Sequence, residues 1–184
     1  SWYWGAGPGF STREPYKGAS GGTRLVQYFD KARMEINKPE ANRTDPWYVT
    51  NGLLVREMIS GLVQIGDQSS LQLEPARIPL AGDANGVGPT YASLYPVASL
   101  DNDRRVPNRT GSPVIEVISA SGKITERPEM GRYTTNAYYV PETSHNIPSV
   151  FWDFLQQRGP IQIGNGIENG LISDWVFALG FPIT

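Results

Sequence analysis

The order of apolar and polar positions along the chain predicts short strands joined by turns. Residues 23–37 alternate between polar and apolar side chains on both sides of Asp30 and Lys31, a pattern typical of a β-hairpin. Residues 114–126 predict a second hairpin, with Ser121 and Gly122 at its turn. The doubled apolar residues of this second segment favour a strand that is buried on both faces.

Two segments have the spacing of short helices instead. The first covers residues 50–61, where Thr50 and Asn51 are suited to cap the helix and Gly61 is suited to end it. The second covers residues 148–159 and begins at a proline. Its apolar stripe should cover one side of a sheet and consists of Phe151, Phe154 and Leu155.

The remaining segments lack either period. Residues 66–112 contain five prolines with many Gly and Asn residues, a composition that limits strands to short pieces between long ordered loops. Residues 1–22 combine glycine with aromatic side chains, and we expect an extended arm that docks through its rings. The expected fold is mainly β (β-rich α+β): a single domain over residues 1–184, with this aromatic arm and a β-rich globular body over residues 23–184.

Composition narrows the classes of function. The chain has 184 residues, a net charge of −2 and no cysteine, so its core must hold without disulfides or a cysteine zinc site. A protein that follows the phosphate backbone of a nucleic acid would carry a basic stripe, and none is present, so nucleic acid is not an expected partner. No apolar stretch approaches the roughly 20 residues of a membrane span. No cofactor is expected.

The sequence offers little chemistry for catalysis. His145 is the one histidine, which excludes a two-histidine metal site within a chain. Glu142 or Ser144 could pair with it in a hydrolase, but serine, histidine and asparagine just before a helix are also capping residues. We therefore expect a structural role for His145 and a protein that is not an enzyme. Two acidic turns, at 83–86 and 101–103, lack the spacing of a calcium loop, so no metal site is expected.

Aromatic side chains in the arm and the loops are the candidate binding residues, because flat rings can stack on sugars or enter a pocket of another subunit. They are Trp2, Tyr3, Trp4, Trp47, Tyr91 and Tyr95. The loop rings could instead pin their own loops to the sheet, whereas Trp152 and Trp175 are expected in the core. Two Asn-Arg-Thr triplets, at Asn42 and Asn108, are candidate glycosylation sites in polar, turn-rich stretches.

Two parts of the chain resemble a repeat of secreted multidomain proteins of thermophilic bacteria, itself similar to LGFP repeats. Residues 139–146 (Tyr-Val-Pro-Glu-Thr-Ser-His-Asn), 150–154 and 179–184 resemble its first half, and residues 26–35 resemble its second half. The order of the halves is inverted, and Ser144 replaces a glycine of the repeat. The resemblance implies an extracellular, non-catalytic module of envelope or cell-wall proteins, and it implies no particular ligand.

These observations together predict a secreted structural or assembly protein. Such a protein could be a subunit of a head-to-tail surface filament. The two halves of the repeat could pair within one chain or between neighbouring chains. A non-catalytic module that binds cell-wall glycan or another carbohydrate is the first alternative, and a secreted hydrolase is the second. The chain begins with Ser1 rather than Met, which is consistent with a processed or trimmed N-terminus.

Overall fold

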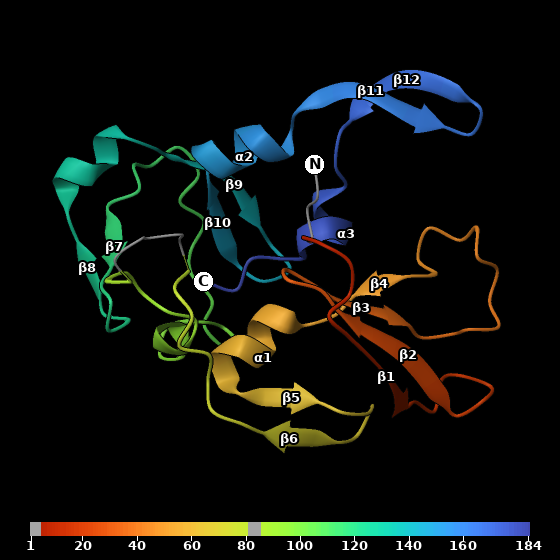
Figure 1. The fold of residues 1–184 in the computed structure, drawn as a ribbon. Helices are drawn as coiled ribbons and strands as arrows, with labels where there is room; N and C mark the ends of the chain where they lie inside the picture. Colours follow the sequence, from red (N-terminus) through yellow and green to blue (C-terminus); the bar gives the residue numbers. More distant parts are fainter. Residues whose placement is uncertain (1–4, 81–85) are drawn as a thin grey trace. The chain divides into compact units, whose positions relative to one another are not determined.

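The computed structural model describes residues 5–80 and 86–184 and confirms a β-rich fold (Figure 1). Twelve short strands and three short α-helices lie in these residues, and every strand pairing is antiparallel. The predicted binding residues Trp2, Tyr3 and Trp4 lie outside the described residues. None of the described helices has the length and apolar character that a bilayer crossing requires.

The chain forms two compact units, where the sequence suggested a single domain. Unit 1 comprises residues 1–78 with 90–92, and unit 2 comprises residues 79–89 with 93–184. Each unit has its own small set of buried apolar side chains, such as Val26 and Ile59 in unit 1 and Val140 and Leu155 in unit 2. A chain with so many loops therefore divides its apolar burial between two small cores.

Unit 1 is built on a four-stranded sheet in the order β1-β2-β3-β4. The hairpin predicted over residues 23–37 is confirmed. Residues 10–15 pair along their whole length with β2, so this part of the predicted arm is an edge strand of the sheet. The strands are β1 (Phe10–Pro15), β2 (Thr23–Tyr28), β3 (Arg33–Ile36) and β4 (Thr50–Asn51).

The first predicted helix is present as α1 (Leu54–Ser60) and ends as expected at Gly61. Gly61 has a φ of +72° and its N–H donates to the Glu57 carbonyl, the left-handed ending that favours glycine. The predicted start was wrong, because Thr50 and Asn51 pair with β3 as β4 and no side chain caps α1. A hairpin of β5 (Leu62–Gln64) and β6 (Ser70–Gln72) follows.

Unit 2 consists of three separate hairpins and two helices. The predicted hairpin around Ser121 and Gly122 is confirmed, but its burial on both faces was wrong, because β7 is half-buried and β8 is exposed. The strands are β7 (Glu116–Ile118), β8 (Ile124–Glu126), β9 (Asn136–Val140), β10 (His145–Pro148), β11 (Arg158–Ile163) and β12 (Gly166–Leu171).

Helix α2 (Ser149–Leu155) packs against β9 and β10, as predicted, but of the predicted stripe only Leu155 is buried, whereas Phe151 and Phe154 are exposed. It ends four residues earlier than Gly159, because the chain turns at Gln156 and enters β11. A third helix, α3 (Trp175–Leu179), was not predicted; the Asp174 carboxylate caps it by accepting from the Phe177 N–H at 3.1 Å. Two 3-10 turns, Ala92–Leu94 and Pro128–Arg132, complete the elements.

Candidate binding groove

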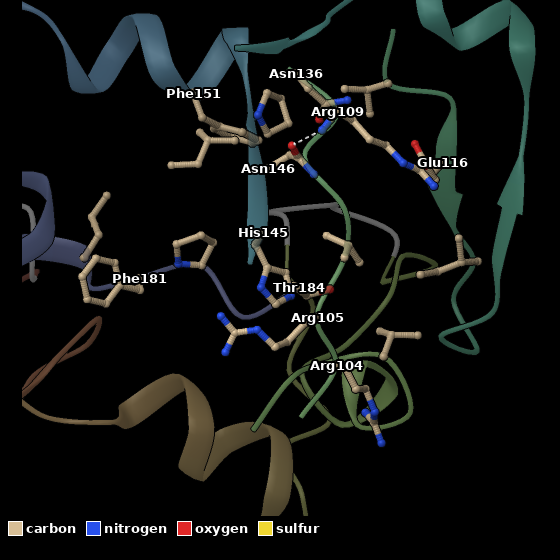
Figure 2. Close-up of a pocket in the computed structure, with 18 of the residues that line it drawn as sticks. Arg104, Arg105, Arg109, Glu116, Asn136, His145, Asn146, Phe151, Phe181 and Thr184 are labelled. Carbon is tan, nitrogen blue, oxygen red and sulfur yellow. Dashed lines mark hydrogen bonds and ion pairs between the residues drawn. The ribbon is translucent and has the colours of Figure 1, made fainter. Parts of the chain in front are cut away.

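Unit 2 contains a groove of about 1100 Å³ (Figure 2). Its walls come from six segments of that unit: the loop before β7, the β7–β8 hairpin, the start of strand β9, strand β10, helix α2, and the residues from α3 onwards. Short elements that leave one side uncovered produce this hollow, because neither the β7–β8 hairpin nor α2 is wide enough to close it.

Large apolar side chains form much of the groove wall. Phe151 and Phe154 extend from α2, while Leu179 and Phe181 come from the end of α3 and the residues after it. Phe151 is 64% exposed and Leu179 is 63% exposed, whereas Leu155, one turn after Phe151 on the same face of α2, is buried. Apolar surface exposed to water costs roughly 25 cal/mol per Å², so this wall favours an occupant that would cover it.

A row of four rings runs through the elements behind and within this wall, and its members Trp175 and Phe181 line the groove themselves. Tyr138 of β9 stacks on Trp152 of α2 with centroids 4.1 Å apart and planes 3° apart. Trp152 meets the edge of Trp175 at 6.1 Å, and Trp175 meets Phe181 at 6.0 Å in the same edge-on manner. Trp152 and Trp175, which the sequence placed in the core, are half-buried members of this row. The row fixes α2, α3 and the last residues relative to one another.

The cations that line the groove are engaged with the fold. Arg104 donates from Nη1 to the Tyr95 and Ala98 carbonyls at 2.8 and 2.7 Å. Arg105 donates from Nε to Ser144 Oγ at 2.8 Å, and Arg109 forms an ion pair with Glu116. Guanidinium groups held this way do not offer a free anion site, so the groove is suited to an apolar occupant.

His145 is buried at the floor of the groove, in β10 rather than at a helix cap. Its Nδ1 lies 2.7 Å from the Thr143 carbonyl oxygen, which fixes that nitrogen as the donor. The residue at the helix start is Pro148, and no side chain caps α2, so the capping role was wrong. In the described part of the chain, no carboxylate hydrogen bonds to the His145 ring.

The segment around His145 instead anchors the loop that passes over it. Asn146 Oδ1 accepts from the Arg109 N–H at 2.8 Å, a bond visible in Figure 2, and its Nδ2 donates to the Pro107 carbonyl at 2.9 Å. Ser144 occupies the turn between β9 and β10 with a φ of +55°, a left-handed conformation that favours glycine. These bonds hold one wall of the groove in place.

The aromatic residues predicted from the loops are not gathered in this groove. Trp47 is 58% exposed and Tyr91 is half-buried, both in unit 1, while Tyr95 is exposed in unit 2. The apolar wall residues of the groove were assigned to a sheet-covering stripe instead. Their place in a groove wall could have been recognised from the sequence, because the side chains of Phe151 and Phe154 together present more apolar surface than a helix of seven residues can bury.

Both sequons are exposed and share one local geometry. Asn42 Oδ1 accepts from the Thr44 N–H at 3.0 Å and from the Thr44 hydroxyl at 2.9 Å. Asn108 Oδ1 accepts in the same way from the N–H and hydroxyl of Thr110, at 2.9 and 2.7 Å. Each asparagine therefore lies in a surface turn with space for a glycan.

Unit 1 contains a buried charge cluster that the sequence did not predict. Arg33 bonds to three carboxylates: Glu14 at 2.7 Å, Glu35 at 2.8 Å and Glu57 at 3.0 Å. Arg24 pairs with Glu14 at 3.1 Å and with Glu35 at 2.7 Å. All five side chains are at least nine-tenths buried. The cluster joins β1, β2, β3 and α1.

Burial raises the pKa of two acidic groups in or beside this cluster, the Glu57 carboxyl and the Tyr28 hydroxyl. Burial raises the pKa of the Glu57 carboxyl, although Gln64 N–H and Arg33 donate to it. Burial, followed by the charge of Glu57, raises the pKa of Tyr28 to about 12. The Tyr28 hydroxyl donates to Glu57 Oε2 at 3.0 Å. The cluster therefore links four elements of unit 1 through buried ion pairs and hydrogen bonds.

Among the described residues, no group of three or more His, Cys, Asp or Glu side chains has an arrangement that could hold a metal ion. Comparison with known proteins adds no relative: no family model, no curated protein and no solved structure matches this chain.

Proposed function

We propose that this protein is an extracellular structural subunit that assembles with copies of itself. The groove of unit 2 binds an apolar segment of a neighbouring copy. The observation that carries this proposal is the exposed wall of Phe151, Phe154, Leu179 and Phe181. Contiguous apolar surface of this kind is typical of protein interaction sites.

The size and chemistry of the groove favour a protein segment over a small molecule. Its volume of about 1100 Å³ exceeds the range of roughly 300–1000 Å³ that is usual for small ligands. Arg104, Arg105 and Arg109 already bond to carbonyls, a hydroxyl and a carboxylate of unit 2. A sugar or an anion would need unoccupied guanidinium donors, whereas an apolar segment would be bound by the phenylalanine side chains of the wall.

The extracellular part of the proposal is supported by the two sequons. Exposed Asn42 and Asn108 could each carry a glycan without disturbing a strand. The resemblance of residues 139–146 to a secreted repeat points to the same compartment. Expression in a glycosylating host, with Thr44→Val and Thr110→Val variants, tests each site by its mass.

Sedimentation across a concentration series tests the assembly. The wild-type chain should gain average mass as concentration rises, and Phe151→Asp/Leu179→Ser should remain monomeric. Tyr133→Asp/Val150→Ser is the matched control, because both residues are exposed in unit 2 but do not line the groove. A wild-type chain that stays monomeric throughout would reject self-assembly.

A cell-wall or carbohydrate-binding module is the second candidate, favoured by the exposed Trp47 ring in a unit 1 loop. The Asp45 carboxylate accepts from the Trp47 N–H at 2.8 Å and holds this loop in a defined turn. A sugar stacked on the ring would make binding to insoluble cell-wall glycan sensitive to Trp47→Ala. Binding that survives this change and fails in the Phe151→Asp/Leu179→Ser variant would place the contact in the groove.

A further inference from the structure

The β11–β12 hairpin of unit 2 packs mainly on itself among the described elements, as the β7–β8 hairpin does, but unlike β7–β8 it does not line the groove (Figure 1). Its strands pair from Arg158 with Leu171 to Ile163 with Gly166, so that Gly164 and Asn165 form a two-residue turn. Nearly every residue of the hairpin is exposed or half-buried. An isolated two-stranded hairpin is marginally stable in water, so this one is suited to gain a partner.

Apolar side chains lie on both faces of this hairpin. Residues paired across the strands share a face, which places Ile161 and Ile163 on one face and Ile167 and Leu171 on the other. Ile163 is 53% exposed and Ile167 is 78% exposed. Strands that are apolar on both faces are typical of positions covered from both sides. A flat surface could cover only one of these faces, whereas a groove can cover two.

Glycines shape the first face for close approach. A Cβ at position 170 would come within 2.2 Å of Ile161 Cδ1, so the absent side chain lets Ile161 lie across the strand. Gly166 pairs with Ile163 across the turn and adds no side chain to this face. The hairpin is therefore thin along this face, which suits insertion between two walls.

We infer that the β11–β12 hairpin of one copy occupies the unit 2 groove of the next copy. This inference rests on the proposed self-assembly and names its inserted segment. The hairpin offers isoleucine and leucine side chains, and the groove offers the Phe and Leu side chains of α2 and α3. No residue of the hairpin lines the groove of its own unit.

Charge is compatible with this contact. The hairpin strands carry one residue of each sign, Arg158 and Glu168. The groove is lined by three arginines and two glutamates, among them Arg105 and Glu126. Neither partner therefore brings a large charge of one sign into the contact, and apolar burial decides the association.

The contact joins two different surfaces, the hairpin of one copy and the groove of the next. Each subunit in a pair still has one free groove and one free hairpin. A heterologous contact of this kind propagates into a filament unless its rotation closes a ring.

The test uses two variants of the full chain and their mixture. Ile163→Lys/Ile167→Lys disables the hairpin and Phe151→Asp/Leu179→Ser disables the groove. All four positions are exposed, so both variants should retain the wild-type circular dichroism spectrum. Each variant alone should be monomeric at concentrations where the wild-type chain has at least tripled its average mass. Val87→Lys/Val150→Lys, two exposed β-branched residues of unit 2, should assemble as the wild type does.

The mixture of the two variants should give a 1:1 dimer that does not grow, because one intact hairpin meets one intact groove. Absence of that dimer would overturn the inference even if the wild-type chain assembles. A hairpin variant that assembles normally, while the groove variant does not, would leave self-assembly standing and assign a different segment. Deletion of residues 1–4 would then identify the aromatic arm if the mass fell to that of a monomer. A monomeric wild-type chain would reject the proposed assembly itself.

Discussion

Arg33 has no exposed side-chain surface and bonds to a carboxylate from each of three elements. Moving a guanidinium out of water is costly, and its partners recover that cost only while every charge remains paired. Two arginines and three glutamates occupy the buried charge cluster, and Tyr28 and Gln64 supply further donors. Single substitutions here should therefore affect stability more than substitutions of exposed charges.

Arg33→Met should lower the free energy of unfolding of unit 1 by about 3–5 kcal/mol, because it leaves three buried carboxylates short of a partner. Hydrogen exchange of the β2 and β3 amides, measured under native conditions, reports this loss. Arg13→Met is the matched control, since Arg13 is exposed on β1 of the same sheet. A loss in the free energy of unfolding below about 1 kcal/mol, as expected for an exposed ion pair, would contradict the prediction that the buried cluster stabilises unit 1.

Glu57 gives the cluster a pH dependence of defined sign. Burial raises its folded-state pKa above the ordinary glutamate value of about 4.3. The folded state therefore holds this proton more tightly than the unfolded state. The contribution to stability is complete below about pH 4.3 and is lost as pH rises through the folded-state pKa. In Glu57→Gln the side chain does not titrate, so the free energy of unfolding of the variant minus that of wild type should increase between pH 4 and 8.

Urea unfolding at several pH values measures this difference. Glu40→Gln serves as a control of opposite sign. The Ser20 N–H donates to Glu40 and lowers its pKa, so its contribution is present above about pH 4.3 and is lost as pH falls. A Glu57 difference that decreases with rising pH would mean that the donors from Arg33, Tyr28 and Gln64 outweigh burial.

At the scale of elements, the sequence predicted those strands and helix ends that depend on neighbouring residues alone. Polar and apolar alternation located the β2–β3 hairpin, and Gly61 located the end of α1. Alternation did not predict which face of the hairpin is buried. Arg33 and Glu35 alternate with Met34 and Ile36, yet the charged pair is the buried one, because partners from other elements compensate it. Such compensation depends on distant residues, which sequence periodicity does not register.

The groove was missed for a related reason. Phe151 and Phe154 have helical spacing, and a helical apolar stripe normally indicates a buried face. Here α2 is only seven residues long and packs mainly through Leu155 and Trp152, which leaves both phenylalanines exposed. The β11–β12 hairpin was also missed, although Ile161, Ile163 and Ile167 around a Gly-Asn turn carry the alternation of a hairpin. Its glycines and Pro160 weaken that signal.

Gly61→Ala tests whether the ending of α1 is as restrictive as its geometry indicates. A Cβ at this position would lie 2.1 Å from the Leu73 carbonyl oxygen, and the left-handed φ costs about 1–2 kcal/mol for a residue with a side chain. Thermal unfolding should show a loss of at least that size. Gly21→Ala, where a Cβ meets open space and φ is not positive, should change the free energy of unfolding by less than about 1 kcal/mol. Equal losses at the two positions would contradict the prediction.

The whole molecule combines two small units whose described surface carries many exposed apolar side chains. Its net charge of −2 provides little long-range repulsion between copies. Association of such molecules is then decided by the surfaces that meet rather than by overall charge. The two candidate surfaces of unit 2, groove and hairpin, are both mainly apolar, which sets an expectation for how salt affects assembly.

Assembly should therefore persist in concentrated sodium chloride. Raising ionic strength from about 0.1 M to about 1 M shortens the Debye length from about 10 Å to about 3 Å and weakens contacts between exposed charges. Apolar burial is not screened, and sulfate strengthens it. Sedimentation should give dissociation constants that agree within about threefold across this sodium chloride range and that fall in sodium sulfate of equal ionic strength. Dissociation in 1 M sodium chloride would instead assign the contact to exposed charges such as Arg158 and Glu168, because apolar side chains cannot respond to screening in that direction.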